Sequence, residues 1–174
     1  YRDHPNVESV TLCELNQGML NDYARKFRFE NKTDSFDALC DSDVDAIHIV
    51  TGIPNHAELV LKALKAGKHV ACTVPMATNI DDMYRIIEAQ RASGKNYMMM
   101  ETSIYTYHCL YVKQLIDDGK LGRIQYLRGT HFQDMEAWPD YWMGLPPFWY
   151  ATHAVSPLLY LSDSYATRVQ CLGS

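Results

Sequence analysis

Along the first hundred residues, short runs of hydrophobic positions alternate with segments in which hydrophobic positions recur at helical spacing. Short apolar runs predict strands over residues 7–15, 45–51, 69–73 and 96–101. Apolar side chains at helical spacing predict helices over residues 16–29, 35–40, 56–66 and 80–94. Because strands alternate with helices, we predict an α/β fold with a doubly wound parallel sheet.

The pattern changes after Tyr105, where we predict a boundary between a first domain, residues 1–105, and a second, residues 106–174. In the second, helices are predicted over residues 110–118 and 153–161, and strands over residues 124–132 and 166–172. The first of these strands is long and alternating, which is typical of an antiparallel sheet. Residues 138–149 hold three prolines and three tryptophans, and we predict an irregular loop that covers something.

Composition and charge exclude several classes of partner. A net charge of -5 and a pI near 5.7 offer no basic face for nucleic acid. No apolar run approaches the roughly 20 residues of a membrane helix. Five cysteines without a C-x-x-C pair suggest neither a disulfide framework nor a zinc site, and we expect reduced thiols in the cytoplasm.

Small polar residues follow the predicted strands. Because ligands sit at the carboxyl ends of strands in open parallel sheets, residues 51–55 and 73–75 should line one crevice. Glu101 follows another apolar strand, and a carboxylate buried there would be costly without a partner, so we expect it to face the crevice. These strand ends predict the place of a binding site.

A dinucleotide-binding sheet opens with a strand, a G-x-G-x-x-G turn and a helix, and it carries an acidic residue about 20 positions later, at the end of its second strand. Glu14, at the end of the first strand predicted here, fits that acidic position. Counting back from Glu14 leads to a position before Tyr1, and no G-x-G occurs in the chain. We therefore expect a piece of a longer protein that lacks the first βα unit. A carboxylate at Glu14 would accept hydrogen bonds from the adenosine ribose and repel a 2'-phosphate, which favours NAD over NADP.

Three sequence segments carry a resemblance to a known family. They are Pro54-Asn55-His56-Ala57-Glu58, Ala66-Gly67-Lys68-His69-Val70, and the run from Leu115 to Ile124 that reads LIDDGKLGRI. In this order they resemble the glucose-fructose oxidoreductase, inositol dehydrogenase and MocA family of NAD(P)-dependent oxidoreductases. The resemblance implies a Rossmann-type domain followed by the beginning of an α+β domain for substrate binding and oligomerisation.

Two segments depart from most of that family. Where most members have Glu-Lys-Pro, this chain has Thr73-Val74-Pro75, and where they have Asp-x-x-x-His it has Trp149-Tyr150-Ala151-Thr152-His153. The NAD-dependent glycosidases of the same superfamily resemble this chain in both places. They also share the strand end Met100-Glu101-Thr102-Ser103-Ile104-Tyr105.

His153 is the candidate catalytic base, because an imidazole titrates near neutrality. Tyr150 precedes it by three residues, so on one helical turn the two would share a face, and a phenol there would pass a proton or hold a sugar hydroxyl. Spacing alone leaves a second interpretation open for each residue. His153 would only cap its helix, and Tyr150 would only anchor an aromatic loop.

The remaining predicted contacts belong to two groups, and for several of them a purely structural role stays open. The residues expected to contact the cofactor are Glu14, Thr51, Pro54, Asn55, His56, Thr73, Val74, Pro75 and Glu101. The residues expected to contact a carbohydrate are Tyr105, His131, Asp134 and Trp149. No recognisable metal-ligand spacing is present, so no metal is expected.

The resemblance and the residues together predict an NAD-dependent oxidoreductase that transfers hydride from a sugar, polyol or related carbohydrate derivative. One alternative is an NAD-dependent glycosidase that works by transient oxidation and elimination. Another is a non-catalytic protein that binds sugar or nucleotide. A homo-oligomer formed through the second domain is expected from the resemblance.

Overall fold

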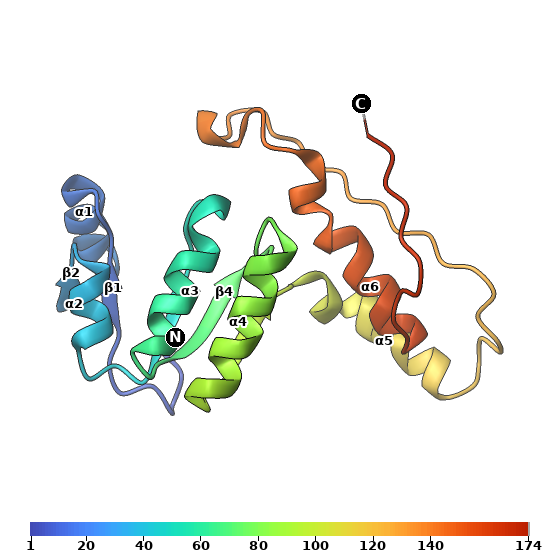
Figure 1. Ribbon diagram of the computed structural model, residues 1–174, viewed down its shortest axis with the longest axis horizontal. Helices are drawn as coiled ribbons and strands as arrows, with labels where there is room; N and C mark the ends of the chain where they lie inside the picture. The colour runs from blue at the N-terminus through green and yellow to red at the C-terminus, as the bar shows by residue number, and fades with distance from the viewer. Residues whose placement is uncertain (174) are drawn as a thin grey trace.

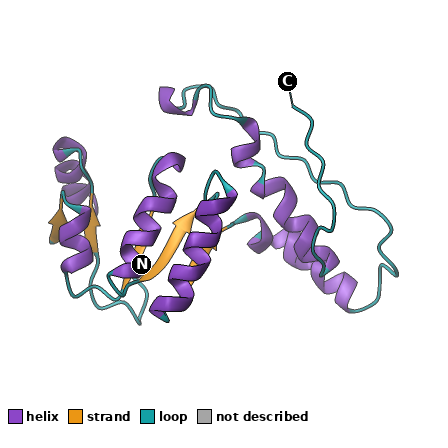
Figure 2. Ribbon diagram, in the orientation of Figure 1, coloured by secondary structure: helices purple, strands orange, loops and turns teal. Residues whose placement is uncertain are grey.

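The computed structural model describes residues 1–173, and its strands and helices alternate through the first half of the chain (Figures 1 and 2). The elements of this half are β1 Thr11–Cys13, α1 Gln17–Phe27, β2 Asn31–Thr33, α2 Phe36–Asp41, β3 Ala46–Ile49, η1 Ile53–Asn55, α3 His56–Lys65, β4 His69–Thr73, α4 Ile80–Ser93 and β5 Tyr97–Met100. The second half holds η2 Ser103–Tyr105, α5 Tyr107–Asp117, η3 Asp140–Trp142, η4 Pro147–Tyr150 and α6 Thr152–Ser162.

All strand pairs are parallel, which confirms the predicted α/β fold. The strands form two sheets, one ordered β1-β2 and the other β3-β4-β5. In the larger sheet β4 lies in the centre, with Ile49 opposite Cys72 and Thr73 opposite Met100. The short strand β2 was not predicted, because the segment Asn31–Thr33 is polar and lacks the apolar run that marks the other strands.

Local capping explains where the helices of the first half begin and end. The side chains of Asn16, Ser35 and Asn79 accept hydrogen bonds from backbone N–H groups in the first turns of α1, α2 and α4. Gly67 has a φ of 75° and Gly94 a φ of 64°, the left-handed conformation that glycine adopts without a steric cost. These signals are short-range, so the sequence predicts these ends closely.

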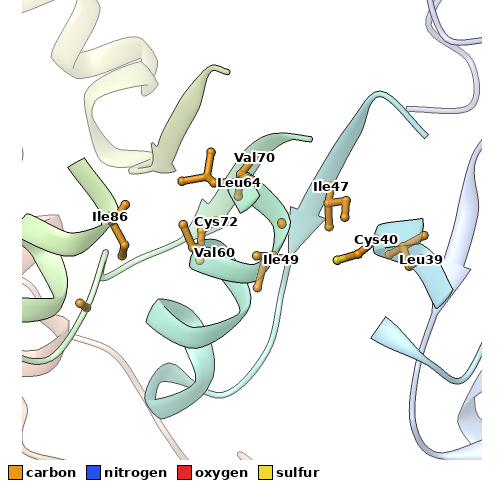
Figure 3. Close-up of a cluster of buried hydrophobic side chains, with 11 residues drawn as sticks. Leu39, Cys40, Ile47, Ile49, Val60, Leu64, Val70, Cys72 and Ile86 are labelled. Carbon is orange, nitrogen blue, oxygen red and sulfur yellow. The ribbon is translucent and has the colours of Figure 1, made fainter. Parts of the chain in front are cut away.

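The hydrophobic core lies between the larger sheet and the helices α2, α3 and α4 (Figure 3). Val60, Ala63 and Leu64 of α3 are fully buried, as are Cys72 of β4 and Ile86 of α4. Burial raises the pKa of the Cys72 thiol to about 12, so at neutral pH it packs as a neutral group. Each fully buried Leu, Ile or Val contributes about 1.5–3 kcal/mol relative to exposure. This packing fixes the loops that follow β3, β4 and β5.

The second half differs from the prediction in its strands. Helices α5 and α6 are present and pack against each other. Residues 124–132 and 166–172, however, form no strand, and the predicted antiparallel sheet is absent from the described part of the chain. An extended segment needs a neighbour to accept and donate its backbone hydrogen bonds, and none of residues 1–173 pairs with these segments. The boundary between residues 105 and 106 stays a prediction.

Candidate active site

The carboxyl ends of β3, β4 and β5 lie at one edge of the larger sheet, because the three strands are parallel and adjacent. Residues 51–55 follow β3, residues 74 and 75 follow β4, and Glu101 follows β5. The strand order places the segment after β4 between the other two. The three segments that were predicted to line one crevice therefore follow adjacent strands at the same edge of the sheet.

His56 joins two of these walls. Its ring is fully buried, with Nδ1 2.7 Å from the carbonyl oxygen of Pro75 and Nε2 3.2 Å from that of Thr51. The hydroxyl of Thr73 lies 3.4 Å from Nε2. The side chain predicted to contact the cofactor is thus enclosed by protein. It holds the loop after β3 against the loop after β4, so any part it has in binding acts through those loops.

The other predicted cofactor residues differ in exposure. Val74 is buried, and the Val74–Pro75 peptide bond is cis. Asn55 is exposed and precedes α3 without a side-chain capping bond. Glu14 is half-buried just beyond β1, where its Oε1 accepts a hydrogen bond of 2.8 Å from the backbone N–H of Asn16. A carboxylate at a strand end that keeps part of its surface in solvent is a suitable acceptor for hydroxyl donors.

The structure brings His153 and Glu101 into direct contact. Nδ1 of His153, in the first turn of α6, lies 2.6 Å from Oε1 of Glu101. The two side chains are 11% and 4% exposed, so this charge-assisted bond is largely shielded from water. Because a carboxylate only accepts hydrogen bonds, Nδ1 carries the hydrogen, and in the neutral ring Nε2 is the basic nitrogen.

Ser103 completes the support of this pair. Its backbone N–H donates to Oε1 of Glu101 at 2.8 Å, and its hydroxyl lies 3.1 Å from Nδ1 of His153. Burial by itself raises the pKa of the Glu101 carboxyl, but the Ser103 N–H and the His153 imidazole outweigh it and lower the pKa. Glu101 therefore stays ionised at neutral pH and orients the imidazole.

Two further predicted residues surround His153. The ring of Tyr150 meets the imidazole edge-on with 4.8 Å between centroids, and the ring of His131 lies 4.9 Å away. Burial, followed by the negative charge of Glu101, raises the pKa of Tyr150, so its phenol stays protonated at neutral pH. The site thus joins a proton acceptor to an adjacent proton donor.

Three predicted carbohydrate contacts lie outside this cluster. Tyr105 is 58% exposed in η2. The carboxylate of exposed Asp134 accepts a hydrogen bond from the backbone N–H of Glu136. Trp149 lines a cavity beside Tyr150 and does not stack on His153. Their roles in binding stay predictions.

Sequence reasoning missed Ser103 and Trp142. Ser103 belongs to the strand-end motif from Met100 to Tyr105 but was given no role of its own. A serine two residues after a buried carboxylate is well placed to donate its backbone N–H to that carboxylate. Trp142 stacks edge-on against Tyr150, with 5.5 Å between centroids. No local signal identifies Trp142, because the contact depends on how the loop folds.

The aromatic loop, residues 138–150, also reaches the end of β3. Tyr141, Trp142 and Leu145 enclose a cavity of about 250 Å³ together with Gly52, Ile53 and Pro54. Figure 1 shows this orange segment extending toward the beginning of α3. The loop after β3 is thus linked to His153 through the aromatic loop, and Glu101 links His153 to β5.

Two general properties concern the described residues as a whole. Within residues 1–173, no three His, Cys, Asp or Glu side chains are grouped so that they would hold a metal ion. No helix in this range is both long and apolar enough to span a bilayer.

Curated relatives include enzymes of two kinds. The chain is 28% identical over 178 residues to glycosyl hydrolase family 109 protein 1 of Bacteroides fragilis, an alignment that covers 91% of this chain and 38% of the relative. It is 31% identical over 130 residues to levoglucosan dehydrogenase of Pseudarthrobacter phenanthrenivorans, covering 74% of this chain and 33% of the relative. The chain thus spans less than two-fifths of the length of these two proteins.

Solved structures resemble the fold over most of the chain. Levoglucosan dehydrogenase in complex with NADH and levoglucosan superposes with a TM-score of 0.75 at 27% identity, covering 87% of this chain and 44% of that one. The family model for the oxidoreductase family with an NAD-binding Rossmann fold, named Gfo/Idh/MocA, matches residues 1–101. The chain therefore belongs to the Gfo/Idh/MocA oxidoreductase family, as its sequence motifs predict.

Proposed function

We propose that the protein is an NAD-dependent oxidoreductase that transfers a hydride from a sugar, a polyol or a related carbohydrate derivative. The observation that carries this proposal is the 2.6 Å contact between Nδ1 of His153 and Glu101, beside the carboxyl ends of the strands. It orients the imidazole in a partly dehydrated site so that Nε2 is the nitrogen left to accept a proton. The levoglucosan and inositol 2-dehydrogenases among the relatives support a carbohydrate-like substrate.

In this mechanism Nε2 of His153 takes the proton of the substrate hydroxyl. The positive charge that forms on the ring is stabilised by Glu101, which stays ionised. Tyr150 stays protonated beside it and donates a hydrogen bond to a neighbouring substrate oxygen. The reverse proton transfer serves the reduction of a carbonyl group.

The residues at the strand ends fit a dinucleotide. When bound, NAD accepts the hydride that leaves the substrate carbon. Thr51 and Thr73, held together by His56, would contact the nicotinamide ribose, and the half-buried carboxylate of Glu14 would accept hydrogen bonds from the adenosine ribose hydroxyls. That carboxylate would repel a 2'-phosphate, which favours NAD over NADP.

A second function, glycoside hydrolysis with transient use of NAD, is favoured by Val74. This buried, apolar side chain stands where most family members have the lysine, and a lysine is absent from the described contacts of His153. Glycosyl hydrolase family 109 proteins are also among the relatives. In this function the same imidazole would remove the proton from the carbon next to the oxidised one, and elimination would expel the leaving group. Addition of water to the resulting double bond and return of the hydride to the sugar would complete the hydrolysis without net oxidation.

An assay of the protein expressed from its complete gene separates these functions. Bound cofactor is first released and identified after denaturation. The enzyme is then supplied with NAD and either free sugars or chromogenic glycosides, while the absorbance of reduced nicotinamide and of the released chromophore is followed. Net reduction of NAD supports the dehydrogenase, and chromophore release without net reduction supports the glycosidase. Binding without either reaction would leave a non-catalytic sugar or nucleotide protein.

A further inference from the structure

A second cavity, of about 170 Å³, lies under the aromatic loop directly beside Tyr150. Its walls include Trp138, Trp142 and Trp149 from the loop and Ile53 from the segment after β3. Gln133 is the one amide side chain among the lining residues. The surface of the cavity is therefore mainly apolar and aromatic, and its side-chain polar groups are the Gln133 amide, the Tyr150 hydroxyl and the three indole N–H groups.

Edge-on aromatic contacts connect this cavity to the candidate catalytic base. Trp138 meets Trp142 with 5.0 Å between centroids, Trp142 meets Tyr150 at 5.5 Å, and Tyr150 meets His153 at 4.8 Å. Tyr150 is thus a wall shared by the cavity and the site of proton transfer. A group in the cavity lies one phenol ring away from the imidazole.

We propose that this cavity binds an apolar substituent, such as an aryl or alkyl group, of the same carbohydrate whose ring lies at His153. The proposal rests on the proposed function, and it narrows the substrate class from free sugars to glycosides or ethers with an apolar group. The sugar ring itself is a poorer occupant, since the mainly apolar walls offer too few partners for all of its hydroxyls once they have lost water.

The size and chemistry of the cavity agree with a group as large as one aromatic ring. A dry apolar cavity of about 150 Å³ accommodates benzene. Stacked and edge-on aromatic contacts stabilise such a ring beyond the burial of its area. Both the dehydrogenase and the glycosidase function accept this substrate class, because the substituent does not take part in the hydride or proton transfer.

The test compares matched ligands. The protein expressed from its complete gene is loaded with NAD, and its Kd is measured by calorimetry for phenyl and methyl glycosides of glucose, galactose and mannose, in both anomeric forms. For at least one sugar, the phenyl glycoside should bind about tenfold more tightly than its methyl counterpart, or better. Equal affinities in every pair, or no binding of any phenyl glycoside, would overturn the proposal.

Variants locate the effect in the cavity. Trp142→Ala should bring the ratio of phenyl to methyl affinity close to one, and Trp142→Phe should retain most of it. Leu145→Trp fills the cavity from its wall and should also bring the ratio of phenyl to methyl affinity close to one. Tyr165→Ala, which removes a ring that is 83% exposed, is the control and should leave the ratio intact. If the phenyl-to-methyl affinity ratio stays high in both Trp142→Ala and Leu145→Trp, the phenyl group binds outside this cavity.

The outcomes also separate this proposal from the proposed function, because the ratio is read from binding alone. If the phenyl-to-methyl affinity ratio is high but the protein neither reduces NAD nor cleaves glycosides, the cavity proposal is supported and the proposed enzymatic function is contradicted. If the protein turns over a sugar but the affinity ratio is near one, the enzymatic function is supported and the cavity proposal is contradicted.

Discussion

Residues 1–105 and residues 106–173 reach their structures by different means. The first part buries a continuous core between α2, α3, α4 and the larger sheet. In the described residues after 105, Cys109 is the one buried residue, and α6 has none. Large side chains such as Tyr107 and Phe132 are exposed there. Within the described residues, the first part thus packs a core of its own, whereas the second buries few of its side chains.

This difference shows how the side chains of the candidate site are held in position. His153 and Tyr150 belong to the weakly buried part, yet His153 is held by Glu101, which ends β5 of the packed part. The rigid strand end fixes the carboxylate, and the carboxylate fixes the imidazole. The proposed base therefore comes from the weakly buried part and the group that orients it from the packed part, and three experiments test this arrangement.

The largest effect is expected at His153. Replacing it with Gln removes the basic nitrogen, so turnover should fall about 10²- to 10⁴-fold. The parallel variant His153→Asn places its amide nitrogen near the position of Nδ1, so it still donates a hydrogen bond to Glu101, and its Kd for NAD and urea midpoint should change little. Initial rates, cofactor titration and unfolding curves measure the three quantities. Turnover within twofold of the parent would remove His153 from the mechanism.

The next effect concerns stability. Leu64→Ala empties a fully buried position in α3 and should lower the free energy of unfolding by about 2–5 kcal/mol. The same substitution at Leu159 in α6, which is 38% exposed, should cost about 1 kcal/mol or less. Urea unfolding at constant pH measures both. Equal losses would show that the two parts are packed alike.

The smallest effect depends on pH. Because the pKa of Glu101 in the folded protein is lowered from 4.5, its carboxylate stabilises the fold above that pH, and this contribution is lost as the pH falls through the lowered pKa. Glu101→Gln should therefore flatten the acid side of the stability profile, which is measured by urea unfolding between about pH 6 and about pH 3.

The control for this pH experiment is Glu136→Gln, at an exposed carboxylate of the second part. It should reproduce the slope of the parent protein. An unchanged slope in Glu101→Gln would mean that the contact between Glu101 and His153 adds nothing to stability.

Sequence patterns predicted most of the helices, because their signals lie within a few residues of one another. The helices predicted to begin at residues 16 and 80 are α1 and α4, which Asn16 and Asn79 cap, and Gly67 follows the end of α3. The predicted strand over residues 124–132 was wrong, although its alternation is clear, because alternation says which side chains would share a face and supplies no partner strand.

By itself the sequence determined the family, the parallel α/β order of the first part, and the residue types that suit proton transfer and ribose binding. Tertiary structure alone decided that Glu101 orients His153, that His56 is buried between two loops, and that Trp142 packs on Tyr150. The reason is physical. Helix caps and the periodicity of strands depend on neighbouring residues. The contacts named above join residues that are far apart in the chain or lie within an irregular loop, so their geometry depends on packing.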